Sequence, residues 1–420
     1  MQPLNELFYD WQAIELVEKT IPSISFSHTF SVEQESNMRI NYDFGSENES
    51  EQSTLDVLSG NYNENPFLFE NKLTHRMGDE TYWGSKTIHW TESYVDGNGK
   101  RCTRTRSQTL RASVTKPKPF FSTQVVLNYC SQGGPELSFS RDATNLDKKS
   151  EKSIESYVKK GEKRLKRLND KALKKNSDFM SMSNTEFEVL FDALDRTDEV
   201  QYRTLFTPLA QTNMVDLILS KTGYGDDFDF IKHKRTNKII SKHSQGRNIL
   251  LSSQSHISHS FDAIRESFIN KNTEFFKAVY FDFAPLWAIP IYQERPVHSL
   301  KPIEEKMQNY SFKECEALAN RIDKSYTVHP STKTQAILKS IFIKSQDKTD
   351  EINISSFSYD IEKRIDYVSV YGQDGRWHSV PVEWDEYLPL EYSNRFFVST
   401  PELSTEKNII AQGNNLCIYN

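Results

Sequence analysis

Residues 82–114, YWGSKTIHWTESYVDGNGKRCTRTRSQTLRASV, carry the clearest β-strand pattern in the chain and decide its fold. Ile88, Trp90 and Tyr94 alternate with polar residues, as in a strand that turns one face toward a core. The sequence Asp96-Gly97-Asn98-Gly99 then favours a tight turn. The return strand places four small hydroxyl residues on one face: Thr103, Thr105, Ser107 and Thr109. This stretch predicts a long β-hairpin.

The two ends of this hairpin differ in composition. Arg101, Arg104 and Arg106 lie close to the turn, where both faces of the strands are polar, so we expect the tip to project into solvent. Pro117 and Pro119 follow the return strand, and proline has no N–H to donate to a β-ladder. We therefore expect the pairing to stop at these prolines and a further strand over residues 124–129.

A second β pattern occupies the C-terminal part of the chain. Residues 337–343, 352–359 and 365–371 alternate between apolar and polar side chains, which predicts three strands. Gln373-Asp374-Gly375 favours a turn before Val380 and Val382. This pattern predicts a second β-rich unit.

The middle third of the chain has the spacing of helices. Residues 150–176 carry apolar side chains at intervals of mainly three, four or seven, with Lys and Arg at most other positions. A capping-box pattern at residues 183–186 begins the next helix, and Glu188, Asp192 and Asp195 make it acidic. Thr207 followed by Pro208 predicts the start of a third helix, and residues 261–279 predict a fourth helix.

Three other segments have weaker patterns. Residues 5–19 carry a rough helical stripe that ends before Pro22. Residues 33–65 are rich in Glu, Ser and Asn, which is typical of a poorly ordered surface segment or of weak edge strands. The apolar run 281–290 is interrupted by prolines, and we interpret it as a core strand entering the second β-rich unit; the alternative is an exposed docking surface.

These patterns together predict an α+β protein with β-rich N-terminal and C-terminal units that contain long hairpins, connected by a helical middle region. A chain of 420 residues is too long for one ordinary core. We therefore expect three parts: a β-rich unit with an N-terminal helix and a long hairpin over 1–145, a helical region over 146–282, and a second β-rich unit over 283–420.

Composition narrows the class of protein. A hydrophobic content of 36% supports real cores, and the net charge is -6. The four cysteines are far apart with no metal-binding spacing, and no apolar run is long enough to span a bilayer without charges or prolines. Residues 1–10 contain no basic segment followed by an apolar run, so we expect no secretory signal. We expect a soluble cytoplasmic protein, or one peripheral to the membrane.

The helix predicted over 150–176 is the main candidate binding element. Its cationic side chains could neutralise the phosphates of a nucleic acid or of an anionic membrane. The alternative is a solvated surface that the adjacent acidic helix screens. The candidate residues are Lys159, Lys160, Lys163, Arg164, Lys166, Arg167, Lys171 and Lys174.

A histidine group offers a second candidate. Four of the ten histidines lie between His233 and His259, and His256 and His259 are three apart, which is close enough to share a helical face and bind one metal. Asp226 and Asp227 could supply oxygen ligands, although the stretch 223–227 is equally typical of a loop.

Recognisable catalytic motifs are absent from the sequence. The chain has no G-x-S-x-G, no phosphate-binding G-x-x-x-x-G-K, no G-x-G-x-x-G and no H-E-x-x-H. No cofactor is therefore predicted and no small-molecule ligand is identifiable. An enzyme would need a site assembled from dispersed residues, for which residues 226–259 are the best candidate.

The region from Tyr82 to about Gln293 resembles an uncharacterised family of low-GC Gram-positive bacteria and mollicutes. The segments that carry the resemblance are residues 88–92 (IHWTE), 115–119 (TKPKP), 137–141 (LSFSR) and 285–293 (PLWAIPIYQ). It covers roughly half of the chain. Members of this family often have membrane-spanning segments ahead of the region, and we expect none in residues 1–81 of this sequence. The resemblance implies a shared fold and no particular activity.

The sequence leaves three functional hypotheses open. The first is a non-enzymatic interaction or scaffold protein in the cytoplasm or on the inner membrane surface, with a protein partner and with the basic helix and the polar hairpin as contact elements. The second is an enzyme with a dispersed His and Asp site around residues 226–259. The third is a nucleic-acid or anionic-lipid binder that acts through the basic helix.

Overall fold

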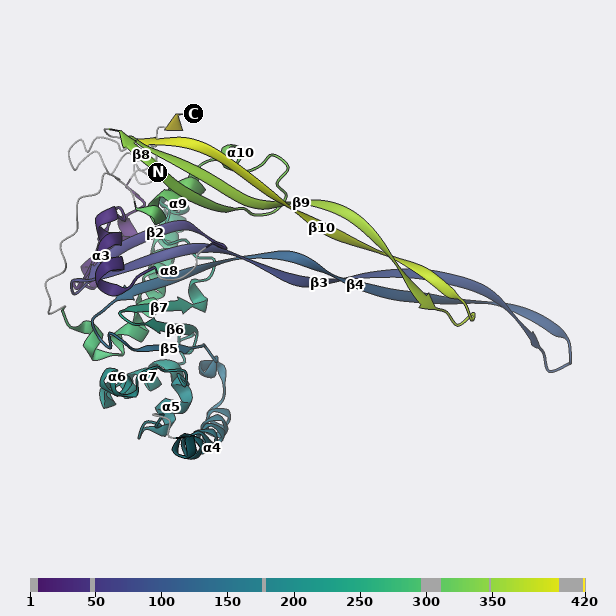
Figure 1. Ribbon diagram of the computed structural model, residues 1–420, viewed down its shortest axis with the longest axis horizontal. Helices are drawn as coiled ribbons and strands as arrows, with labels where there is room; N and C mark the ends of the chain where they lie inside the picture. Colours follow the sequence, from purple (N-terminus) through teal and green to yellow (C-terminus); the bar gives the residue numbers. More distant parts are fainter. Residues whose placement is uncertain are drawn as a thin grey trace.

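The computed structural model of this protein describes residues 7–45, 50–175, 179–295, 311–346, 349–399 and 418–419. It is an α+β structure with β-rich N-terminal and C-terminal regions and a helical middle, as the sequence predicts. Figure 1 shows a body of sheet and helices from which a long arm of paired strands projects.

The body is built on one antiparallel sheet of seven strands. Its spatial order is β1 (Ile24–Ser27), β2 (Gln52–Tyr62), β3 (Asn65–Val95), β4 (Arg101–Cys130), β7 (Thr236–Ser241), β6 (Phe228–His233) and β5 (Ser138–Arg141). β6 and β7, which lie after the helical residues 146–219, therefore join the same sheet as the N-terminal strands. The domain boundary expected between residues 145 and 146 therefore falls within a single sheet, since β5 precedes it and β6 and β7 follow it.

Helices cover one face of this sheet and enclose the largest core. They are α2 (Gln12–Thr20), α5 (Thr185–Phe191), α6 (Glu199–Leu205), α7 (Pro208–Leu219) and α8 (Phe261–Trp287). Phe67 and Phe69 of β3 lie in this core, and the intervening Leu68 lies in a second cluster with Met38 and Tyr42 of α3 (Val32–Tyr42). The period of two in a strand thus divides β3 between two cores.

The helix α9 (Phe312–Arg321) lies between the seven-stranded sheet and a second sheet of four strands. That sheet has the order β11 (Ile418–Tyr419), β10 (Trp377–Ser399), β9 (Thr349–Tyr371) and β8 (Ile337–Gln346). Burial on both sides leaves α9 with charges that need partners inside the protein. The Lys313 ammonium lies 2.6 Å from the Glu70 carboxylate of β3, and both side chains are buried.

The remaining elements are short, apart from one long helix. α4 (Glu151–Lys175) precedes α5 and lies at the end of the body farthest from the arm (Figure 1). The short elements are η1 (Leu146–Lys148), η2 (Lys242–Ser244), η3 (Ser253–His256), η4 (Pro290–Gln293) and α10 (Lys324–Thr327). No helix in the described residues is long and apolar enough to cross a membrane.

The arm consists of two β-hairpins packed face to face. β3 and β4 pair without interruption from Phe67 opposite Tyr129 to Val95 opposite Arg101. β9 and β10 form the second hairpin, which ends at Tyr371 opposite Trp377. A small core joins the two hairpins and contains Ile88, Leu110, Ala112, Val380 and Val382.

The first hairpin confirms the strand pattern and corrects the effect of the prolines. Pro117 lies opposite Asp79 and Pro119 opposite Met77, so β4 is one strand and not two. A proline whose missing N–H would face the open edge removes no ladder bond, and two prolines two residues apart have the same orientation. The expected interruption is therefore wrong.

Two further expectations are wrong. Residues 33–65, expected to be poorly ordered, form α3 and β2 in their described part; a capping box between Ser31 and Gln34 begins α3, and β2 pairs with both β1 and β3. Residues 281–290, expected as a strand, form the end of α8 and the start of η4. The boundary expected between 282 and 283 thus falls inside α8, because the apolar run packs into the core of the first sheet.

Candidate interaction surfaces

The helix α4 confirms the prediction for residues 150–176 and turns its apolar stripe toward the body. Ile154, Leu165 and Ala172 are buried. At Gly161 a Cβ atom would lie 2.3 Å from Val189 Cγ1, so only glycine permits this approach to α5. The buried stripe fixes which side of α4 faces solvent.

All eight candidate cations of α4 are exposed. Arg164 lies 3.2 Å from the Asp192 carboxylate. Within the described part of the chain, none of the other seven forms an ion pair. A solvated ammonium without a fixed counter-charge remains free to bind an anionic partner.

The acidic segment that could screen the cations of α4 forms one ion pair with that helix. Glu188 of α5 is buried, and its carboxylate is paired with Arg196 Nη1 at 2.5 Å. Burial raises the pKa of Glu188, and the Arg196 guanidinium opposes this effect. Asp192, directly after α5, is thus the acidic residue of this segment that forms an ion pair with the basic helix, through Arg164.

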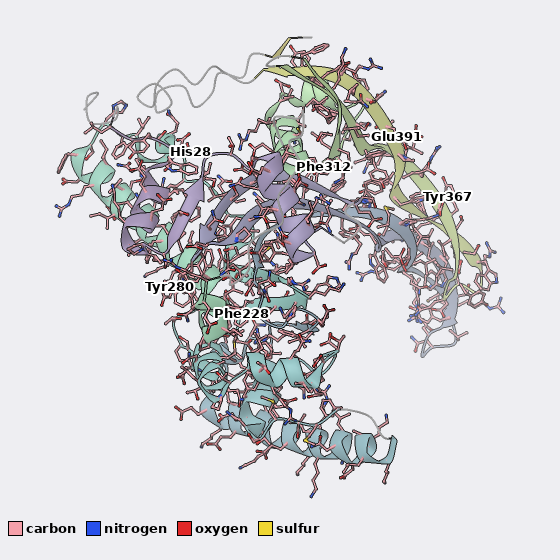
Figure 2. The ribbon with its side chains drawn as sticks, turned by 60° about the vertical axis from the view of Figure 1, so that its left-hand side comes forward. His28, Phe228, Tyr280, Phe312, Tyr367 and Glu391 are labelled. Atoms are coloured by element: carbon pink, nitrogen blue, oxygen red, sulfur yellow. The ribbon has the colours of Figure 1, made fainter. Side chains whose placement is uncertain are left out.

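The outward faces of the arm differ between its two hairpins. On the first hairpin, hydroxyl side chains pair across the strands, with 3.1 Å between Thr81 and Thr115 and 3.0 Å between Thr87 and Thr109. On the second hairpin, Tyr367 and Trp377 are each 70% exposed. Figure 2 shows Tyr367 on the side of the second hairpin that faces away from the body.

The structure brings one of the four histidines of the 233–259 group together with carboxylates. His243 Nδ1 lies 2.6 Å from Asp227 Oδ2, and His243 Nε2 lies 3.3 Å from Asp282 Oδ1 and 3.2 Å from the Ala278 carbonyl oxygen. Arg247 donates to Asp282 at 2.7 Å. His243 is thus held as an imidazolium with both ring nitrogens donating, and no lone pair remains for a metal or for base catalysis.

The other predicted ligands are dispersed. Both carboxylate oxygens of Asp226 are used, by Arg141, by the Thr144 hydroxyl and by the Leu146 N–H. His256 is buried against Phe8 and Phe268.

His259 is exposed and lies outside the short helix that ends at His256, so the two histidines share no helical face. The described residues contain no group of three or more potential ligands placed to hold a metal.

The His243 contacts predict a pH-dependent stability. Burial would lower the pKa of His243, but the hydrogen bonds and charges of Asp227 and Asp282 outweigh it and raise the pKa to about 9. Because this pKa lies above the unfolded value of about 6.5, the stabilisation is complete below pH 6.5 and is lost as the pH rises toward 9. It amounts to about 3 kcal/mol at low pH.

Urea unfolding of wild type and His243→Gln at pH 6 and pH 9.5 measures this effect. The difference in free energy of unfolding between the two proteins should shrink by about 3 kcal/mol at the higher pH. Comparing the two proteins cancels the titration of other groups. An equal difference at both pH values would contradict the assignment of the imidazolium.

Sequence reasoning missed Asp282, Arg247 and Arg141, the buried partners of the predicted residues. Asp282 lies in an apolar run that gave no sign of a charge network, and it is 39 residues from His243 in the sequence. Only Arg141 carried a signal, as a charged residue at the end of the short alternating segment 138–141.

Comparison of this chain with known protein families, with curated proteins and with solved structures finds no match. The family resemblance of residues 82–293 therefore stays a prediction, and the function has to be argued from the surfaces themselves.

Proposed function

We propose that this chain is a non-enzymatic interaction or scaffold protein, working in the cytoplasm or on the inner membrane surface, and that α4 contacts an anionic partner. The observation that carries the proposal is the set of eight exposed cations on α4, of which Arg164 alone has an ion-pair partner among the described residues.

Charge segregation supports this role for α4. Residues 151–175 contain ten Lys or Arg and four Asp or Glu, which is 10 − 4 = +6. The whole chain has a net charge of -6, so the rest of the chain carries -6 − 6 = -12. An anionic partner is thus attracted to α4 and repelled by the remainder, and the position of α4 at one end of the body separates the two effects.

The orientation of α4 favours binding without insertion. An amphipathic helix enters a membrane with its apolar face, and in α4 that face, with Leu165 at its centre, is buried in the protein. Tyr157, the one aromatic residue of α4, is half-buried and offers no stacking platform for single-stranded nucleic acid. Binding should therefore be electrostatic, which suits lipid headgroups or another flat anionic surface.

The enzyme hypothesis receives less support from the structure. Its best candidate, His243, has both ring nitrogens engaged by Asp227, Asp282 and a backbone carbonyl. A general base needs a free lone pair within reach of a substrate. The same arrangement works well as a buried ion-pair network that stabilises the fold.

Charge reversal on α4 tests the proposal. Each Lys or Arg near an anionic membrane contributes about 1 kcal/mol, so changing Lys163, Arg164, Lys166 and Arg167 to Glu should weaken binding by about a thousandfold or more. Binding of purified protein to vesicles with and without phosphatidylglycerol, and to duplex DNA, is measured at 50 and 200 mM salt. Wild-type binding should fall steeply with salt.

A matched control carries the same change in net charge at exposed positions outside α4: Arg111, Arg265, Lys277 and Lys324 to Glu. This control should keep most of its affinity, because the contact is local to α4. Equal losses in both variants, or a wild-type protein that binds neither the vesicles nor the DNA at 50 mM salt, would refute the proposed role of α4.

A further inference from the structure

The outward face of the second hairpin is apolar and uncovered. We define the aromatic face as Ile365, Tyr367, Tyr371 and Trp377, whose exposed fractions are 50%, 70%, 57% and 70%. Such large apolar side chains usually lie in cores or interfaces, and an exposed cluster of them marks an interaction site. In the described structure, nothing from the chain itself covers this face.

The aromatic face is continuous, and Glu383, which lies opposite Ile365, places a charge at one end of it. The Tyr371 and Trp377 rings lie opposite one another with centroids 5.4 Å apart, and Tyr367 lies opposite Pro381. The positions between them on the same side of the ribbon are Ser369 and Ser379. A partner that covers the part of this face between Tyr367 and the Tyr371–Trp377 pair therefore meets no charge and should itself be apolar.

The inward face of the same hairpin shows how such a surface is covered within this protein. Val380 and Val382 point the other way and pack on Ile88 and Leu110 of the first hairpin. At Gly84 a Cβ atom would lie 2.0 Å from the Pro381 carbonyl oxygen, so the two hairpins are in backbone contact. The second hairpin thus carries apolar side chains on both of its faces. This is typical of a sheet that is packed between two other layers.

The edges of the arm are poorly suited to strand addition. Pro117 and Pro119 lie on β4, and Pro381 and Pro389 lie on β10. Each proline removes an N–H that an added strand would need. Contacts of the arm must then be made through its faces, of which the aromatic face is the most apolar.

From these observations we propose that the aromatic face binds the aromatic face of a second copy of this chain. A two-fold arrangement of antiparallel arms, with Ser369 and Ser379 near the axis, would place Tyr371 and Trp377 of one copy over Tyr367 and Pro381 of the other. The stack would then contain four hairpins, with the two apolar ribbons inside. This inference deepens the proposed function by naming one partner, but it does not depend on α4.

The area of the aromatic face fits a weak dimer. A tyrosine or tryptophan offers about 150–250 Å² of surface, so the exposed parts of the three aromatic side chains sum to about 400 Å² in each copy. Two copies would bury about 800 Å² from these rings, and Ile365 and Pro381 bring the total toward the lower range of specific interfaces, about 1,000–1,200 Å². We expect a dissociation constant in the micromolar range.

The aromatic face and α4 point to separate partners. The helix α4 lies at the far end of the body, whereas the second hairpin, which carries the aromatic face, lies on the projecting arm (Figure 1). The apolar aromatic face suits a second copy, and the cationic face of α4 suits the anionic partner.

Sedimentation velocity of the purified full chain between 1 and 200 μM tests the inference. Wild type should pass from monomer to dimer over this range. The double variant Tyr371→Ser and Trp377→Ser should weaken dimerisation by at least about a hundredfold, since aromatic anchors each contribute about 2 kcal/mol or more at an interface. Trp83→Ser is the matched control, because Trp83 is 71% exposed on the first hairpin and should leave dimerisation unchanged.

Three results would overturn this inference. The first is a wild-type chain that stays monomeric up to 200 μM, and the second is a double variant that dimerises as tightly as wild type. The third is binding of monomeric wild type to neutral phosphatidylcholine vesicles that the double variant loses, which would assign the aromatic face to a membrane. None of these results bears on the charge-reversal test of α4.

Discussion

Replacing Asp226 with alanine should lower the free energy of unfolding by about 3 to 5 kcal/mol. Asp226 is fully buried and pairs with the Arg141 guanidinium, whose side chain is 1% exposed. Burial lowers the pKa of Arg141, and the nearby Asp226 carboxylate restores it in part. Without Asp226 the protein would contain a buried cation with no counter-charge, which is among the most costly defects in a core.

Asp226 also holds the connection that follows β5. Its second carboxylate oxygen accepts hydrogen bonds from the Thr144 hydroxyl at 2.5 Å and from the Leu146 N–H at 2.7 Å. The loss should therefore appear as a lower midpoint in urea unfolding and as faster amide exchange at residues 143–148. Asp229→Ala is the matched control, since the half-buried Asp229 accepts one backbone hydrogen bond, from Ala143, and its loss should cost about 1 kcal/mol.

This experiment also decides between a structural and a metal-binding role for Asp226. A metal ligand would make the melting temperature of wild type sensitive to EDTA, whereas an ion-pair partner would not. We expect no change with EDTA and a large change with Asp226→Ala. A small effect of Asp226→Ala, or a clear loss of stability in EDTA, would contradict the structural role.

Replacing Gly84 with valine should separate the two hairpins of the arm. A Cβ atom at this position would lie 2.0 Å from the Pro381 carbonyl oxygen and 3.0 Å from the Val382 Cα. Both are backbone atoms, so the clash cannot be relieved by a side-chain rotation. Overpacking usually costs about 1 to 3 kcal/mol, and here it should expel the buried Val380 and Val382 into solvent.

Hydrogen exchange read by mass spectrometry measures this separation locally. In Gly84→Val, amides of residues 366–384 should lose protection, while those of β6 and β7 in the body should keep it. Gly97→Val is the control, because no atom lies within 4 Å of a Cβ at Gly97. Unchanged exchange in the arm of Gly84→Val would show that the hairpins do not depend on this contact.

Much of the secondary structure follows from local patterns. The alternation around Ile88 and Trp90 and the turn at Asp96–Gly99 predict a hairpin, and the spacing from Ile154 to Ala172 predicts α4. The sequence predicts too short a strand for β4. It does not show whether a proline faces the neighbouring strand, where it would remove a hydrogen bond, or the open edge, where it removes none. The side of α4 that would face solvent was predicted because its apolar and cationic residues separate cleanly around the helix.

For the candidate site residues, exposure to solvent could be predicted from the sequence, whereas ion pairing could not. The exposure of the eight α4 cations agrees with the sequence, because charge and amphipathic spacing decide it locally. Whether those cations are paired depends on where the carboxylates of other segments lie. The acidic character of α5 favours screening of the α4 cations. In the structure, Glu188 pairs with the buried Arg196 instead, and Asp192 pairs with Arg164 of α4.

The sequence by itself therefore determined the α+β class, the two hairpins and the cationic helix, because each depends on a repeat within about 30 residues. Only the tertiary structure decided that His243 is locked between Asp227 and Asp282, that α9 lies between two sheets, and that the aromatic face is uncovered. The physical reason is that these features depend on pairs far apart in the sequence. Their contacts are selected by the packing of the whole chain, and no local periodicity encodes them.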